Sequence, residues 1–156
     1  MRKIINDLVE KLKSEKLTIS SVESLTAGLF CSEIASIPGA SAILRGGIVT
    51  YASDCKVDLA NVKSKSIEKY GVISKIVARE MALGGKEKLK SDICVSFTGN
   101  AGPAVLENKK VGEVFIGIAF NNVVNVYHRV FKGNRNEIRK KSVLFASKKI
   151  LRLLEK

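Results

Sequence analysis

The chain has 156 residues, of which 46% are hydrophobic and 27% are charged, and it contains only two prolines. This length and balance are typical of one globular domain, so residues 1–156 are predicted to fold as a single domain, and a disordered chain is disfavoured. The formal net charge of +12 favours partners that carry phosphate, whether small ligands, nucleic acid or a membrane surface.

The first ten residues are too charged to supply the apolar run of a signal peptide, and no stretch reaches the roughly 20 apolar residues of a membrane span. The protein is therefore expected to be soluble and cytoplasmic, with no membrane partner. Cys31, Cys55 and Cys94 are odd in number and lack metal-site spacing, so they are expected to be buried thiols. No metal and no cofactor are expected.

The first elements are predicted from two different periodicities. Apolar residues recur at helical spacing over residues 3–15, which predicts an amphipathic helix. A β-branched stretch at residues 17–22 predicts a strand. It is followed by a tight turn at residues 23–28 and by a helix that ends before Pro38-Gly39. The order is strand, turn, helix.

The middle of the chain continues the alternation of strands and helices. Residues 45–51 are typical of a second strand, and residues 53–62 of a short helix, with a turn at Tyr70-Gly71. Residues 74–90 carry one apolar face and predict a longer helix, for which the Ser74 side chain is a suitable N-cap.

The last third predicts a buried strand and then a hairpin. Residues 92–98 form a continuous apolar run of the kind found in parallel sheets, followed by a loop at residues 99–103. Asn121-Asn122 separates two further strand-like stretches, residues 111–120 and 123–131, which is typical of a β-hairpin.

A final helix begins near Arg135 and completes the pattern. The predicted fold class is α/β, a three-layer α/β/α domain with a mixed, mostly parallel sheet and a late antiparallel hairpin. Ligands in such folds bind at the carboxyl ends of the strands, so the loops at residues 23–28, 51–56 and 99–103 are the candidate site.

Ser24 follows a predicted strand, and Thr26 and Gly28 lie at the start of the next helix. Free backbone N–H groups and a positive helix end at this position can hold an oxyanion or a phosphate. The alternative is that Ser24 or Thr26 only caps the helix.

A hydrolytic serine needs a base, and the only histidine, His128, lies in a predicted edge strand. We interpret it as an ordinary surface residue. A lysine of lowered pKa can replace histidine. Tyr51 and Lys56 are five residues apart across a strand end and a helix start, so both can face one pocket. A packed tyrosine and a solvated lysine are the alternative.

Two further segments are suited to ligand contact. The stretch Gly99, Asn100, Ala101, Gly102 allows close backbone approach after a buried strand. Arg135 and Arg139 stand one turn apart at the start of the last helix, and an arginine can bind phosphate with two hydrogen bonds. A plain turn and ordinary surface arginines are the alternatives.

Taken in order, these segments resemble the C-terminal domain of the CinA family over essentially the whole chain. Residues 22–28, Val-Glu-Ser-Leu-Thr-Ala-Gly, resemble its Glu-Ser-x-Thr-Gly-Gly turn, and Lys56 occupies the position of its lysine. The other matching segments are Ile37 to Ser41, Arg45 to Tyr51, Tyr70 to Ser74, Ala78 to Ala82, Thr98 to Pro103, Val111-Gly112 and Gly133 to Arg135.

The resemblance implies an amidohydrolase that converts nicotinamide mononucleotide to nicotinate mononucleotide and ammonia without a metal. It implies Ser24 as nucleophile, Lys56 as base, Tyr51 as their positioning partner, and N–H groups of the 26–28 turn as oxyanion donors. Arg135 or Arg139 would bind the substrate phosphate. The remaining substrate-binding residues that it implies are Glu23, Thr26, Gly28, Gly99, Asn100, Ala101 and Gly102. A homo-oligomer is also expected.

The sequence departs from the family pattern at several positions. Ala27, Asn100 and Asn134 replace a glycine, an apolar residue and an aspartate, and residues 104–110 replace a glycine-rich stretch with a shorter loop expected to be less flexible. A noncatalytic nucleotide-binding module is therefore an alternative. Nucleic acid is disfavoured as a partner because interleaved aromatic residues and a helix-turn-helix pattern are missing.

Overall fold

The centre of the computed structural model, which describes residues 1–155, is a five-stranded sheet with strand order β2-β1-β3-β4-β5. Strand β1 is parallel to β2 and β3, whereas β3–β4 and β4–β5 are antiparallel, so β4 alone opposes the other four. The mixed, mostly parallel sheet is confirmed. The strands are β1 (Ile19–Glu23), β2 (Leu44–Val49), β3 (Ile93–Gly99), β4 (Glu113–Phe120) and β5 (Val123–Val130).

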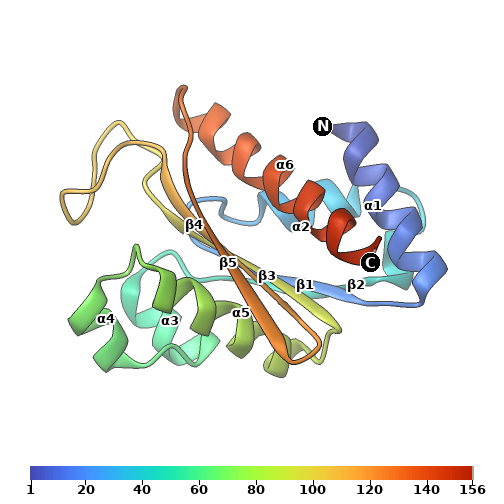
Figure 1. Cartoon of the computed structure of the whole chain (residues 1–156), viewed down its shortest axis with the longest axis horizontal. Helices are drawn as coiled ribbons and strands as arrows, with labels where there is room; N and C mark the ends of the chain where they lie inside the picture. The colour runs from blue at the N-terminus through green and yellow to red at the C-terminus, as the bar shows by residue number, and fades with distance from the viewer. Residues whose placement is uncertain (156) are drawn as a thin grey trace.

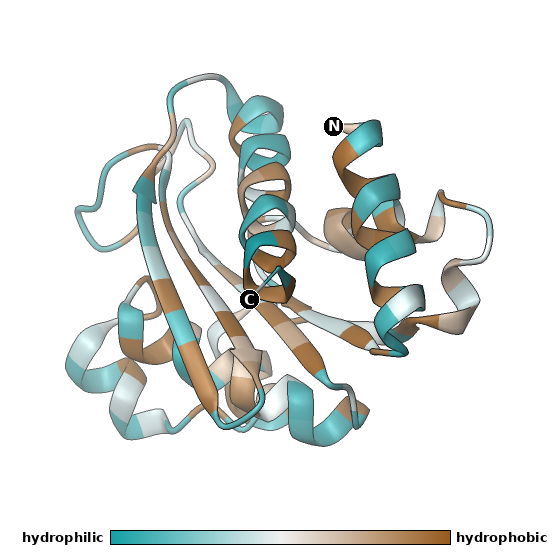
Figure 2. Ribbon diagram, turned by 45° about the vertical axis from the view of Figure 1, so that its right-hand side comes forward, coloured by the Kyte–Doolittle hydropathy of each residue, from teal (hydrophilic) through white to brown (hydrophobic). Residues whose placement is uncertain are grey.

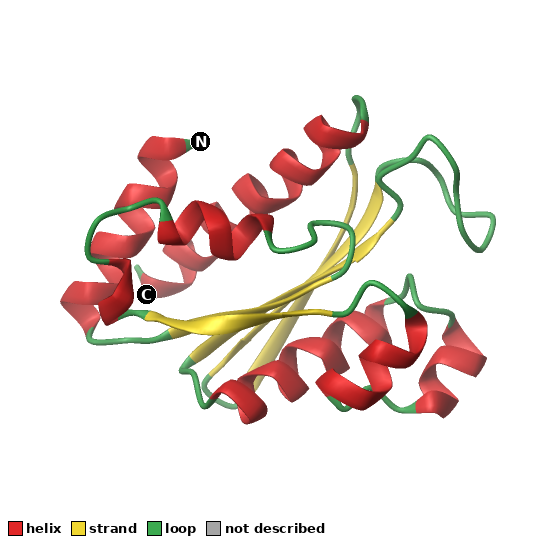
Figure 3. Cartoon of the chain, turned by 180° about the vertical axis from the view of Figure 1, so that it is seen from behind, coloured by secondary structure: helices red, strands yellow, loops and turns green. Residues whose placement is uncertain are grey.

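Helices cover both faces of this sheet, which confirms the three-layer arrangement (Figure 1). Figure 3 shows the two helix layers from behind, with the sheet between them. The first layer holds α1 (Arg2–Glu15), α2 (Leu29–Ala35) and α6 (Arg135–Leu154), with a short 3₁₀ turn at Ala40–Ala42. The second layer holds α3 (Ser53–Ala60), α4 (Ser64–Tyr70) and α5 (Lys75–Leu89).

The two central strands are buried because both of their faces are covered. Every residue of β1 is buried, and β3 is buried up to its last residue. The larger core lies between the sheet and the first helix layer, where the apolar faces of the helices turn toward the strands (Figure 2). Burial of these apolar side chains is the main source of stability.

The hairpin and the helix cap follow the sequence prediction closely. Asn121 adopts a left-handed backbone conformation (φ 53°) at the β4–β5 turn, which asparagine tolerates better than most residues. The Ser74 side chain accepts a hydrogen bond from the N–H of Val77 at 3.2 Å and caps α5. Both predictions are confirmed.

The direction of the strands gathers the candidate loops at one edge of the sheet. Because β1, β2, β3 and β5 point the same way, their carboxyl ends meet at the same edge. These ends lead into the turn after Glu23, into Tyr51, into the loop after Gly99, and into the start of α6.

Helix α4 was not predicted from the sequence. Its seven residues contain one aliphatic side chain, Ile67, so they show no helical periodicity. The helix is held by Glu80 of α5, whose carboxylate accepts hydrogen bonds from the Ser66 hydroxyl at 2.7 Å and from the Lys63 N–H at 3.0 Å. Tertiary contacts therefore define this element.

The expectation of three buried thiols was wrong for two of them. Cys94 is buried, and burial raises its pKa to about 12, whereas Cys31 and Cys55 are partly exposed. Cys31 lies on α2 and Cys55 on α3. All three cysteines are free.

Among residues 1–155, none of the helices is both long and apolar enough to span a bilayer.

Helix α5 approaches α3 closely at a glycine, and this contact sets the position of Lys56. A Cβ added at Gly84 would lie 1.7 Å from the carbonyl oxygen of Ala60. We expect Gly84→Ala to lower the free energy of unfolding by about 2 kcal/mol, because backbone atoms must move apart. Chemical denaturation measures the free energy of unfolding of the variant. The exposed Lys75→Ala serves as control, and equal stability of the two variants would contradict the prediction.

Candidate active site

The loops at the carboxyl edge of the sheet enclose a cavity of about 180 Å³. Its lining residues come from the turn after β1, the segment after β2, the loop after β3 and the first residue of α6. Its lining residues are Ser24, Leu25, Tyr51, Gly99, Asn100, Ala101, Gly102, Ala104, Val105, Leu106 and Arg135. Seven of the predicted site residues therefore share one cavity.

Ser24 lines this cavity, and Lys56 lies directly behind it, in contact with Ser24 but not among the lining residues, although the two are 32 residues apart. Ser24 is the first residue after β1, and its N–H donates to the carbonyl of Phe97 at 3.0 Å, which fixes its backbone. Lys56 lies on the inner face of α3, and its amine is 3.3 Å from the Ser24 hydroxyl oxygen. This distance is at the long end of a hydrogen bond.

The Lys56 amine is buried without a counter-ion. The residue is 2% exposed, and its Nζ donates to the Thr50 carbonyl oxygen at 2.7 Å. Among residues 1–155 no carboxylate lies within 4.0 Å of it. Burial lowers the pKa of Lys56 because the charged form loses its hydration, and the more distant charges of Cys55 and Glu107 oppose this shift. Burial therefore shifts the equilibrium toward the neutral amine.

Glu23 does not line the cavity and instead organises the Ser24 turn. Its buried carboxylate accepts hydrogen bonds from the Ser21 hydroxyl at 2.8 Å and from three backbone N–H groups, those of Gly28, Phe30 and Cys31, at 2.9–3.2 Å. The amino end of α2 thus faces Glu23. It is not the anion site expected beside Ser24, because the buried carboxylate already takes its donors.

A different backbone N–H is free at the cavity. The Ser24 carbonyl accepts from the Ala27 N–H at 3.0 Å, and in a trans peptide the N–H of Leu25 must point the opposite way. Within residues 1–155 this N–H has no hydrogen-bond acceptor. The Thr26 N–H also has no acceptor within residues 1–155, but Thr26 is buried and does not line the cavity. Leu25 lines the cavity, so its N–H, and not those of Ala27 and Gly28, is the candidate oxyanion donor. No side-chain pattern could have marked it.

The two candidate arginines occupy different places. Arg135 donates to the Tyr51 hydroxyl at 2.6 Å and to the Gly102 carbonyl at 2.8 Å, so it lies at the cavity and links two of its walls. The Tyr51 hydroxyl therefore contacts Arg135, not the Ser24 and Lys56 pair it was expected to position. Tyr51 itself is 57% exposed.

Arg139 lies off the cavity. Its guanidinium donates to the carbonyls of Leu25 at 3.0 Å and Thr26 at 2.9 Å, and to the side chain of Asn136 at 3.2 Å. All three nitrogens are thus engaged, two of them in holding the Ser24 turn against α6 and the third within α6. Thr26 is fully buried and does not line the cavity, and its hydroxyl has no partner within residues 1–155.

Asn100 holds the following loop. Its buried side-chain amide donates to the carbonyls of Leu106 at 3.1 Å and Lys109 at 3.3 Å, and its oxygen accepts from the Leu106 N–H at 3.0 Å. The amide is therefore fully used within the protein, although the residue borders the cavity. Asn134 likewise keeps a structural role, because it forms a capping box with Glu137 at the start of α6.

His128 does not line the cavity, in agreement with its interpretation as a surface residue. It lies on edge strand β5, about half exposed, and its Nε2 is 3.0 Å from a Glu113 carboxylate oxygen. The described residues contain no cluster of three or more His, Cys, Asp or Glu side chains that suits a metal ion. The expectation of no metal stays a prediction.

Comparison with known proteins finds one family. The model of the CinA C-terminal domain matches residues 1–154. A "CinA-like protein" of Petrotoga mobilis is 44% identical over 146 residues, covering 93% of this chain and 36% of its own length. The "Protein MG115 homolog" of Mycoplasma pneumoniae is 42% identical over 149 residues, covering 95% of this chain and 92% of its own.

A solved structure agrees. The "competence/damage inducible protein CihA" of Agrobacterium tumefaciens has a TM-score of 0.93 and 29% identity, covering 99% of this chain and 95% of the other. The chain spans about a third of the length of the first relatives it matches, which contain further sequence. The match to the family model over nearly all residues shows that the chain belongs to the CinA C-terminal domain family.

Proposed function

We propose that the protein is an amidohydrolase that converts nicotinamide mononucleotide to nicotinate mononucleotide and ammonia. The observation that carries this proposal is the buried amine of Lys56, 3.3 Å from the Ser24 hydroxyl and without a carboxylate partner. A hydroxyl next to an uncharged amine is a nucleophile next to its base. The identity of the substrate comes from the family resemblance.

In the proposed reaction, neutral Lys56 takes the proton of Ser24 as the hydroxyl oxygen bonds to the carboxamide carbon. The Leu25 N–H stabilises the oxyanion that forms. The Lys56 ammonium then returns the proton to the amide nitrogen, the C–N bond breaks, and ammonia leaves with an ester on Ser24. Water, deprotonated by Lys56, adds to this ester. The C–O bond to Ser24 breaks as the Lys56 ammonium returns its proton to the serine oxygen, and the released acid loses its proton to solvent to give the carboxylate.

Arg135 is the residue best placed for the phosphate of the substrate. Its guanidinium lies at the cavity and contacts the Tyr51 hydroxyl and the Gly102 carbonyl, both of them neutral groups. A phosphate is a stronger acceptor for a guanidinium than either of these groups. Arg139 is instead engaged with backbone carbonyls of the Ser24 turn, so we assign it a positioning role.

Replacement of the nucleophile gives the direct test. Ser24→Ala should reduce ammonia release from nicotinamide mononucleotide by at least about 1,000-fold, while the fold is kept. A coupled ammonia assay measures the rate, with the exposed Ser32→Ala as control. Full activity of Ser24→Ala would rule out this nucleophile. Calorimetric binding of the nucleotide by the unaltered protein, without any product, would indicate a noncatalytic binding module.

The pH dependence follows from the role of Lys56 as a base. Only its neutral form accepts a proton, so kcat/KM should fall on the acid side of its pKa. Because burial lowers that pKa, the inflection is expected below the ordinary 10.5 of a lysine. The permanently charged Lys56→Arg should be inactive at every pH. A rate that does not change with pH below 10.5 would contradict this assignment.

The buried amine should also cost stability. The pKa of Lys56 is lower in the folded than in the unfolded chain. The free energy of unfolding is therefore reduced at neutral pH, and this reduction disappears as pH rises to 10.5. We expect Lys56→Met to be inactive yet more stable at pH 7 by about 1 kcal/mol, or about 2–4 °C in Tm. The exposed Lys65→Met is the control for thermal unfolding. A large loss of stability in Lys56→Met would contradict the prediction.

A further inference from the structure

The loop between β3 and β4 presents two aliphatic side chains to solvent at the cavity. Val105 is 43% exposed and Leu106 is 60% exposed, and both line the cavity that contains Ser24. With Ala104 they form one apolar side of a cavity to which Tyr51 and Arg135 contribute polar groups. Exposed aliphatic groups gain free energy when a ligand covers them.

The first anchors of this loop come from β3 and from the segment before α5. The Asn100 amide makes three hydrogen bonds to the loop backbone, two of them to Leu106. The Glu107 carboxylate accepts from the N–H groups of Val72 at 2.6 Å and Ile73 at 3.1 Å. The backbone of Leu106 and the side chain of the next residue are thereby fixed.

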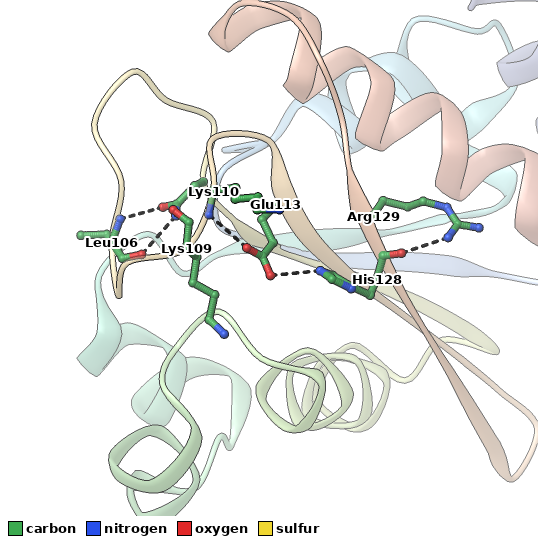
Figure 4. A network of polar contacts seen from close by, with 7 residues as sticks. Leu106, Lys109, Lys110, Glu113, His128 and Arg129 are labelled. Atoms are coloured by element: carbon green, nitrogen blue, oxygen red, sulfur yellow. Dashed lines mark hydrogen bonds and ion pairs between the residues drawn. The ribbon is translucent and has the colours of Figure 1, made fainter.

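A second group of contacts holds the end of the loop. Figure 4 shows the Glu113 carboxylate between the Lys110 backbone and the His128 ring, with Leu106 and Lys109 on the neighbouring stretch. The Lys110 N–H donates to Glu113 at 3.0 Å, and the His128 ring nitrogen is 3.0 Å from the other carboxylate oxygen. A loop ordered by its own polar contacts loses little entropy when it binds a ligand.

We infer that Val105 and Leu106 form an apolar wall that packs against the face of a flat aromatic ring and so selects carboxamides attached to such a ring, with Glu107 and Asn100 as the residues that position it. The inference rests on the proposed function and names the feature of the substrate that this loop recognises. Different sides of the cavity bind the two parts of the substrate. The wall contacts the ring, and Arg135 contacts the phosphate. The loop that departs from the family pattern is thus the specificity element.

Two matched variants test the wall. Leu106→Ala should raise KM for nicotinamide mononucleotide about 10-fold and leave kcat within about twofold, because the contact with the ring is the same in the ground and transition states. Leu59→Ala, which truncates an exposed leucine of α3 away from the cavity, should change neither constant. Equal KM values for the two variants would overturn the inference while leaving the proposed function intact.

The role of Glu107 as a positioning residue is tested by combining its replacement with that of Leu106, because two changes that act through the same wall should not have additive effects on KM. Glu107→Ala alone should raise KM as Leu106→Ala does, because the wall loses its anchor on the Val72 and Ile73 N–H groups. In the Leu106→Ala background the same change should add less than about twofold to KM. Fully multiplicative effects would overturn the role of Glu107 as an anchor of the wall.

A binding experiment keeps the inference independent of turnover. Calorimetry on Ser24→Ala protein should show that Leu106→Ala weakens binding of nicotinate mononucleotide about 10-fold, while binding of ribose 5-phosphate, which lacks the ring, is unchanged. Absence of turnover by the unaltered protein, combined with this pattern, would refute the proposed function and support the wall. Equal weakening of both ligands would overturn the wall.

Discussion

Removal of the Lys56 amine from water, without a carboxylate to balance its charge, is the constraint on which the candidate site depends. An ammonium in this place would lose its hydration and gain only the Thr50 carbonyl and the Ser24 hydroxyl. Since the neutral amine loses far less, the fold itself favours the form that can accept a proton. The same burial that destabilises the charged lysine makes the neighbouring serine a candidate nucleophile.

The sheet topology creates this environment. Four strands point the same way, so Ser24 after β1 and Thr50 after β2 emerge at one edge, and α3 then returns Lys56 to the same place. The contact between α5 and α3 at Gly84 presses that helix against the sheet. The position of the amine is therefore set by backbone packing at some distance from the cavity.

Charged side chains near the site are used mainly to hold its loops. Glu23 organises the Ser24 turn, Arg139 ties the same turn to α6, and Glu107 fastens the loop that carries Val105 and Leu106. Arg135 alone among them lines the cavity. This division leaves a single cation for an anionic ligand and a rigid apolar surface beside it, which is the basis of the ring selectivity inferred above.

The sequence by itself determined the layered α/β fold, the hairpin at Asn121-Asn122, and the placement of Ser24 and Tyr51 in loops at one edge of the sheet, because periodicity and turn chemistry are local properties. It missed α4, whose helical state depends on Glu80 of another helix. Only the tertiary structure separated Arg135 from Arg139, placed Glu23 outside the cavity lining and identified the free N–H of Leu25. These depend on the direction of hydrogen bonds between segments distant in the chain, and residue order does not specify that direction.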